Sequence, residues 1–417
     1  MAHEIPRSKV KLSKAGFFQK LQCKTRDNKM RNPDIQFTRL RWLLTFAGLF
    51  LYVADIYTDI SLALMYFQEK QWVWTGLTIL FVLAGLLVTQ IFSCAWYWDD
   101  IKEDLLKPQE QISGISKGGL TLLHVLGVGI FIRYYHLLNK GSKVVWTTKK
   151  SHTLEESRDV HVHTHPSLFS LATDLSMLKL FEVFLESVPQ LLLQLYIVQG
   201  RDEDSVMQYV SMAFSLSNTA WALVDYRRCL RRSLPHIKEM PPGIPTAVYL
   251  LYKLCTITSH ILSYSLLLIL NIYSIIALII LCLLGMIWTQ LLQTNFCSSK
   301  YLELLYRAVT GVILTFTFFN VKGQDTKVPM IIYYSCHTFI NNMALLLLAF
   351  LKPELQTDRF LLTVCGLIIV GSVLGLVSLV WYYVFLHPRE KCSEADEVDG
   401  LGRETKATRR IRNFLQP

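Results

Sequence analysis

Long apolar stretches separated by short polar segments make up most of the chain from residue 42 onward. One helix crosses the hydrocarbon core of a bilayer with roughly 20 apolar residues, and stretches of about that length recur along this chain. The pattern predicts an all-α polytopic membrane protein. We expect about eight transmembrane helices and two re-entrant helical segments, arranged in two pseudo-symmetric halves.

The first membrane half is predicted to cover residues 42–239, with spans at residues 42–67, 73–96, 171–198 and 206–224. Residues 118–138 are also apolar, but Gly127 and Gly129 weaken a spanning helix there. Both flanks of this segment are basic, with Lys117 before it and Lys140 after it. The positive-inside rule keeps both flanks on the cytoplasmic side, which predicts a re-entrant or interfacial hairpin.

The second half is predicted to cover residues 240–386, since the Pro- and Gly-rich stretch from Met240 to Pro245 cannot continue a helix. Its spans are predicted at residues 246–270, 272–292, 328–351 and 360–386, with a second re-entrant segment at residues 304–319. A weak internal repeat supports the division, because Leu122-Leu123, Gly129 and Lys140-Gly141 recur at one offset as Leu304-Leu305, Gly311 and Lys322-Gly323. An even number of crossings in each half makes the repeats parallel.

Polar side chains occur at helical spacing within the span at residues 171–198. They lie four or eight residues apart, so a helix places them near one stripe: Asp174, Glu182, Glu186, Gln190 and Gln194. A carboxylate that faces lipid costs about 2.5–3.5 kcal/mol on insertion scales, so the stripe is expected to face other helices or a wet cavity. Pro189 predicts a kink just past Glu186. A purely structural helix held by buried ion pairs is the alternative.

Further charged residues lie in the other apolar segments. Asp55 and Asp59 form an i,i+4 pair on one face of the first span. Arg133 and Arg307 each lie on one of the re-entrant segments and are expected to be ion-pair partners or phosphate contacts, as is Lys179. Together these residues predict a polar track through the membrane, formed by Asp55, Asp59, Asp174, Glu182, Glu186, Arg133 and Arg307.

Composition and charge agree with a membrane protein. Hydrophobic residues make up 52% of the chain, and the formal net charge is +10. The basic excess is typical of cytoplasmic loops, and residues 1–41 are predicted to be a basic cytoplasmic tail, so nucleic acid is not expected as a partner. No cofactor or metal is expected: a Walker-type phosphate loop is absent, and alternate histidines at residues 161–165 are better interpreted as a polar loop.

The polar segment at residues 387–417 is predicted to be a cytoplasmic tail with two features. The first is an ideal executioner-caspase recognition sequence, for which cleavage is expected between Asp399 and Gly400: Asp396, Glu397, Val398, Asp399 and Gly400. A solvated acidic linker is the alternative. The second is an apolar cluster among arginines, formed by Ile411, Phe414 and Leu415. Such a peptide could also lie on the membrane surface.

Several motifs of the chain resemble the XK-related family of membrane proteins. They are DLSMLKLFE at residues 174–182, ESVPQL at 186–191, YR at 306–307, FFNVKGQ at 318–324, VDY at 224–226, RRSLP at 231–235 and RIRNFL at 410–415. The resemblance extends from about residue 46 to the C-terminus, so no function is carried over to residues 1–41.

The resemblance implies a phospholipid scramblase of the plasma membrane that stays silent until a caspase cuts its cytoplasmic tail. The cut protein would then expose phosphatidylserine on dying cells, and the segment containing Ile411, Phe414 and Leu415 would act before cleavage as an autoinhibitory plug. Membrane phospholipids and an executioner caspase are the expected partners, with both termini in the cytoplasm. Two alternatives remain, a small-solute transporter or channel and a non-transporting scaffold for a single-span membrane partner.

Overall fold

The computed structural model describes residues 37–104, 117–147, 165–200, 205–233, 243–294, 296–297, 299–321, 327–352 and 359–386. Within these ranges the chain forms helices and short connections, and no strand. The elements are α2 (Arg39–Gln68), α3 (Trp72–Asp104), α4 (Lys117–Val125), α5 (Gly129–Ser142), η2 (Lys143–Thr147), α7 (His165–Leu185), α8 (Ser187–Gly200), α9 (Val206–Ser233), α10 (Ile244–Leu270), α11 (Ser274–Leu291), α12 (Lys300–Phe316), α13 (Lys327–Leu351), α14 (Arg359–Trp381) and η5 (Tyr382–Leu386).

Six helices in the described part of the chain are long and apolar enough to cross a bilayer: α2, α3, α10, α11, α13 and α14 with η5. A seventh crossing results if the bent pair α4 and α5 is one broken span. The outward faces of these helices are apolar. In α11 only Thr289 is buried, while Ile275, Ile279 and Leu283 are half-exposed. Such a surface is suited to lipid, and the predicted fold class, an all-α polytopic membrane protein, is confirmed.

The other two predicted spans, at residues 171–198 and 206–224, are helical as well but are not among the helices that are long and apolar enough to cross a bilayer, so the described residues contain six or seven such spans where about eight were predicted. These two segments form α7 with α8, and α9. Every residue of α7 from 172 to 184 is buried. Because neighbouring helices cover α7, its charged side chains do not meet lipid, and the helix does not need an apolar outer face.

The central helix is interrupted at Glu186, where α7 ends and α8 begins. Pro189 has no N–H group, so the carbonyl of Leu185 loses its donor in the following turn. The adjacent bonds persist, with Glu186 N–H donating to Glu182 O at 2.8 Å and Gln190 N–H donating to Glu186 O at 2.9 Å. The sequence predicts a kink just past Glu186, and the structure places the interruption at Glu186 itself.

The segment predicted as the first re-entrant hairpin bends sharply. Helices α4 and α5 meet at 118°, and Gly127 between them has φ +79°, a left-handed conformation that glycine adopts without strain. The second segment differs, because α12 is one unbroken helix that ends at Phe316 and continues into extended backbone at Thr317. The depth of both segments in the membrane stays a prediction.

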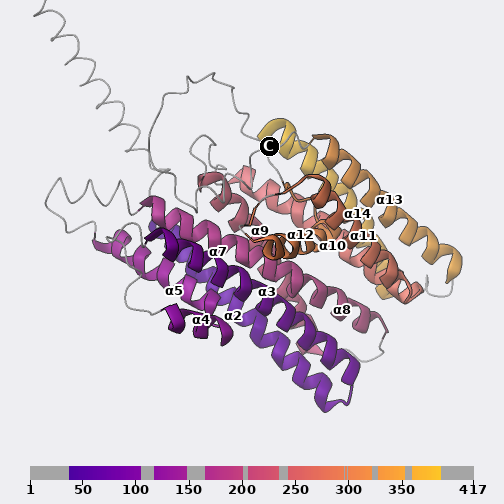
Figure 1. Cartoon of the computed structure of the whole chain (residues 1–417). Helices are drawn as coiled ribbons and strands as arrows, with labels where there is room; N and C mark the ends of the chain where they lie inside the picture. The colour runs from indigo at the N-terminus through magenta and orange to yellow at the C-terminus, as the bar shows by residue number, and fades with distance from the viewer. Residues whose placement is uncertain are drawn as a thin grey trace, which may run out of the picture.

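The helices form two groups that meet along the middle of the molecule (Figure 1). In the first group, α2, α3, α5 and α9 pack around α7 and α8, and in the second, α13 and α14 pack on α10 while α11 packs on α12. The groups join where α8 and α9 meet α10, and where α7 meets α12. Pseudo-symmetry between the two halves, and their assignment as domains, stay predictions.

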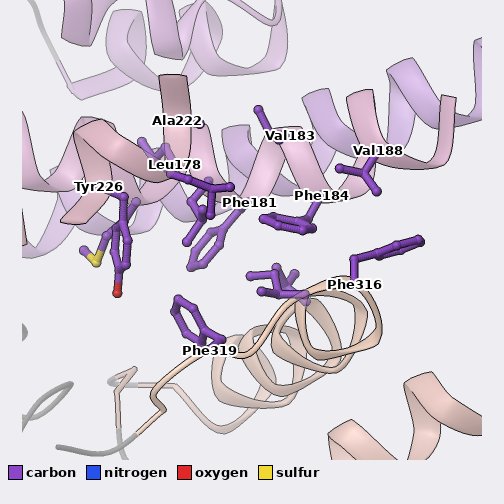
Figure 2. Close-up of a cluster of buried hydrophobic side chains, with 14 of the residues drawn as sticks. Leu178, Phe181, Val183, Phe184, Val188, Ala222, Tyr226, Phe316 and Phe319 are labelled. Carbon is purple, nitrogen blue, oxygen red and sulfur yellow. The ribbon is translucent and has the colours of Figure 1, made fainter. Parts of the chain in front are cut away.

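An aromatic core fills the space between the two groups (Figure 2). Phe181 and Phe184 of α7 point toward the side of Phe316 and Phe319, while Tyr226 of α9 comes within 5.7 Å of Phe319, measured between ring centroids. Helix α7 is therefore two-faced. Its aromatic face packs against the second group, which leaves its polar stripe for the helices of the first.

Candidate functional site

The polar stripe of α7 and α8 is buried in the first group of helices. Its members are 0–2% exposed: Asp174, Glu182, Glu186, Gln190 and Gln194. Such burial agrees with the prediction that the stripe faces other helices, because a carboxylate that faces lipid is unfavourable in free energy. Gly85 of α3 makes room for one of them, because a Cβ atom there would lie 2.7 Å from Oε2 of Glu186. The stripe faces α2, α3 and α9 and forms the centre of a polar column.

Asp55 is the best-connected carboxylate of this column. Its Oδ2 accepts hydrogen bonds from Ser187 Oγ at 2.6 Å and from Asn218 Nδ2 at 2.8 Å, and its Oδ1 accepts one from Ser215 Oγ at 2.9 Å. One turn further along α2, Asp59 Oδ1 accepts from Ser211 Oγ at 2.8 Å. These bonds join α2, α8 and α9, so both aspartates hold the first group of helices together from within.

Lys179 is the cation at the centre of the column. It forms an ion pair with Glu182, one turn along the same helix. Its ammonium also lies 4.0 Å from the centroid of the Tyr52 ring on α2, within the range of a cation–π interaction. Lys179 therefore balances one carboxylate and ties α7 to α2.

Arg133 of α5 closes one end of the column. Its Nη1 lies 3.4 Å from Oδ2 of Asp174, its Nε donates to Ser93 Oγ at 2.8 Å, and its Nη2 donates to Ser93 O at 3.0 Å. The guanidinium lies 4.2 Å from the centroid of the Tyr97 ring and 5.7 Å from that of Trp96. Both rings are buried, so they face Arg133 inside the protein. This differs from the typical placement of aromatic residues at a span end, toward lipid headgroups.

The other end of the column is a chain of neutral hydrogen bonds. Gln208 Nε2 of α9 donates to Tyr66 Oη at 2.9 Å, and Tyr66 Oη donates to Gln194 Oε1 at 2.5 Å. At 1.5 Å of rise per residue, the stripe from Asp174 to Gln194 is roughly 30 Å long. The hydrocarbon core of a bilayer is about 30 Å thick, so the column is long enough to extend through it.

Several buried polar atoms of the column have no hydrogen-bond partner. Among the residues that the structure describes, they are Asp59 Oδ2, Glu182 Oε1, Glu186 Oε1, Gln190 Oε1, Gln194 Nε2 and Asn218 Oδ1. An unpartnered buried polar atom is unfavourable by about 1–3 kcal/mol. So many on one line indicate a site that is completed by something polar.

Arg307 does not join this column. It lies on α12, where its Nε is 3.5 Å from Glu303 Oε1 and 3.0 Å from Thr294 Oγ1. Its Nη2 donates to Thr294 O at 2.8 Å. The structure thus brings six of the predicted track residues into one column (Asp55, Asp59, Asp174, Glu182, Glu186 and Arg133) and places Arg307 in a separate ion pair of the second group.

Sequence reasoning missed the partners that α9 and α8 supply. Ser211, Ser215 and Asn218 recur at intervals of four and three residues within an apolar span, and this spacing places them on one face of a helix. Gln208 continues the same face. The signal was therefore present, in the same form as the stripe that predicted the acids of α7.

Two further sets of predicted site residues lie outside the described residues. They are the caspase recognition sequence at residues 396–400 and the plug residues Ile411, Phe414 and Leu415. Their roles stay predictions from the sequence.

The Lys179→Met variant is expected to lower the free energy of unfolding by about 3–5 kcal/mol, the usual effect of removing one partner of a buried ion pair. Methionine keeps an unbranched side chain but leaves the buried carboxylate of Glu182 without its ion-pair partner. The apparent melting temperature of the purified protein measures the effect. The matched Glu186→Gln variant removes a carboxylate with no hydrogen-bonded partner, so it should be at least as stable as the parent. Equal stability of Lys179→Met and the parent would contradict this account of the column.

Comparison with known proteins gives consistent similarities. The sequence signature of the family described as XK-related protein matches residues 43–388. The chain is 58% identical to XK-related protein 9 of Tetraodon nigroviridis over 387 residues, which cover 92% of this chain and 100% of that protein. It is 30% identical over 376 residues to XK-related protein 8 of the same fish, covering 86% of each chain. With XK-related protein 8 of Gasterosteus aculeatus it shares 28% identity over 364 residues, 85% of this chain and 86% of that one.

Proposed function

The chain belongs to the XK-related family of membrane proteins, and from this premise we propose that it is a phospholipid scramblase. The proposal holds that transport is ATP-independent and bidirectional and that it is activated when an executioner caspase cuts the C-terminal tail after Asp399. Phosphatidylserine is thereby exposed on apoptotic cells. The observation that carries the proposal is the buried polar column, which is as long as the hydrocarbon core is thick.

The column supplies what lipid flipping requires. A phospholipid flips slowly on its own because its charged, hydrated headgroup must leave water for hydrocarbon, which is very unfavourable. A line of carboxylates, amides and hydroxyls can replace that water while the acyl tails remain in the lipid. Such a path contains no step of covalent chemistry, so lipid moves down its gradient in either direction.

The structure is proposed to represent the silent state. Asp55, Asp59 and Glu186 are at most 1% exposed, so a headgroup cannot reach them without a movement of the surrounding helices. Removal of the tail is proposed to favour that movement. The protein is proposed to lie in the plasma membrane with both termini in the cytoplasm. Its proposed partners are membrane phospholipids and an executioner caspase, and a single-span membrane protein is a further candidate partner.

The test is lipid exchange in liposomes that contain the purified protein and fluorescent phospholipids in both leaflets. A membrane-impermeant reductant bleaches only the outer leaflet, so about half of the fluorescence should survive with intact protein. After caspase cleavage, nearly all of it should be lost without added ATP, because inner-leaflet lipids reach the outer leaflet.

Two other results would overturn the proposal. No lipid exchange after complete cleavage, with a correctly folded protein, would favour a non-transporting scaffold. Cleavage-dependent uptake of radiolabelled solutes without lipid exchange would favour a transporter or channel, in which the same column conducts a solute.

A further inference from the structure

The column contains more acidic than basic side chains. Arg133 is matched by Asp174, and Lys179 by Glu182. Asp55, Asp59 and Glu186 remain, each at most 1% exposed and with no cationic side chain within salt-bridge distance among the described residues. Three acids without counter-charges at this depth favour the arrival of a positive group.

The unpartnered atoms of the column lead independently to the same conclusion. Asn218 Nδ2 donates to the carboxylate of Asp55. This bond fixes the orientation of the Asn218 amide, so Asn218 Oδ1 is an acceptor that receives no hydrogen bond. Gln190 Nε2 faces Thr78 Oγ1 at 3.4 Å, and Gln190 Oε1 has no partner. Both side chains are neutral and fully buried. With Asp59 Oδ2, Glu182 Oε1 and Glu186 Oε1, the column has five unfilled acceptors among the described residues, against one unfilled donor, Gln194 Nε2.

The cationic donors of the column, Arg133 and Lys179, are engaged already. The guanidinium of Arg133 is bonded to Ser93 and paired with Asp174, and the ammonium of Lys179 is paired with Glu182 over the Tyr52 ring. A headgroup phosphate offers acceptor oxygens only, so it complements Gln194 Nε2 but none of the five unfilled acceptors. An ammonium group complements these acceptors, because it carries a positive charge and, when primary, three donors.

A metal ion fits the column less well than an ammonium group. Within the described residues, no group of three or more His, Cys, Asp or Glu side chains is arranged to hold a metal. The three acids without a cationic partner come from different elements: Asp55 and Asp59 lie one turn apart on α2, and Glu186 lies at the break between α7 and α8.

We infer that the column recognises the ammonium group of the phospholipid headgroup, through Asp55, Asp59 and Glu186 with the acceptor oxygens of Gln190 and Asn218. The inference rests on the proposed scramblase function and adds a substrate class. Phospholipids with an amino or quaternary ammonium group are substrates, and those without one, such as phosphatidylglycerol, are poor substrates.

Phosphatidylserine and phosphatidylglycerol provide the sharpest comparison, because both carry one net negative charge and only the former has an ammonium group. Caspase-cleaved protein in phosphatidylcholine vesicles is given one or the other as a tail-labelled probe, and exchange rates are measured with the impermeant reductant. Phosphatidylserine should exchange at least about tenfold faster, the factor that corresponds to one charge-assisted hydrogen bond. Equal rates would overturn the inference and leave the proposed function standing. Exchange of neither lipid would overturn both.

Variants locate the selectivity in the column. In Asp59→Asn combined with Glu186→Gln, the two lipids should exchange within about twofold of each other, since the remaining amides attract cations far less than carboxylates do. Glu69→Gln is the matched control: Glu69 is exposed at the end of α2, and its replacement should leave the tenfold preference intact. A preference that survives in the double variant, or that disappears in the control, would refute the assignment to these residues.

Discussion

Replacement of Asp399 by alanine is expected to abolish the exposure of phosphatidylserine that follows caspase activation. Asp396, Glu397, Val398 and Asp399 form a complete executioner-caspase recognition sequence, followed by the small residue Gly400. A protease pocket that is built to bind an aspartate carboxylate is left with unpaired polar groups when the side chain is alanine, and rejection by about 10⁴–10⁵-fold is typical of such sites. Cleavage that is slower by this factor releases no measurable amount of the tail during apoptosis.

The measurement uses cells that express the variant with a tag at the C-terminus. Annexin binding reports phosphatidylserine, and the tag reports cleavage. Glu394→Ala is the matched control, since it removes an acid just outside the recognition sequence and should leave both readouts unchanged. Normal exposure of phosphatidylserine by the Asp399→Ala protein, with no cleavage elsewhere, would defeat the proposed trigger.

The sequence predicted the helices better than it predicted their ends. The predicted span at residues 246–270 lies within α10, and that at residues 328–351 within α13. By contrast, the span predicted to end at residue 96 belongs to α3, which continues to Asp104. Hydropathy detects the apolar part of a helix and misses a continuation through charged residues such as Lys102 and Glu103, although lysine and glutamate are good helix formers.

The stripe of α7 could be predicted because a carboxylate within an apolar span is rare and unfavourable in lipid. Hydroxyl groups are common in such spans and often bond to their own backbone. Thr219 Oγ1 donates to the carbonyl of Ser215, whereas Ser215 Oγ donates to Asp55. Both residues carry a hydroxyl group, but Thr219 bonds to its own helix and Ser215 bonds to a carboxylate of α2. Only the packing of α9 against α2 distinguishes these two roles.

The position of Arg307 could not be predicted from that of Arg133 by analogy between the two halves. Residues 118–138 and 304–319 were both predicted to be re-entrant, but α4 and α5 are bent where α12 is straight. The bend brings Arg133 to Asp174. Arg307 instead pairs with Glu303, and the i,i+4 spacing of these two residues was itself a sufficient reason to expect that pair.

The double variant Phe414→Ala, Leu415→Ala is expected to scramble lipid without any protease. If intact protein is held about 99% silent, the tail favours the closed state by roughly 2.7 kcal/mol, and full switching requires about 5.5 kcal/mol. Burial of two large apolar side chains contributes about 1.5–3 kcal/mol each. Their loss is therefore of the size that shifts the protein from mostly closed to mostly open. The liposome assay measures the effect as bleaching of inner-leaflet lipid by uncleaved protein.

A second variant separates a docked plug from a tail that lies on the membrane surface. Arg409, Arg410 and Arg412 flank the apolar cluster, and each basic residue near an anionic surface contributes about 1 kcal/mol to membrane binding. Replacing all three by glutamine should leave a plug in place, because its apolar side chains remain. Activation by the glutamine variant and silence of the folded alanine variant would show that the tail acts from the membrane surface. We expect the glutamine variant to stay silent and the alanine variant to be active. A plug that is released by one cut must hold the closed state through contacts that end with its removal.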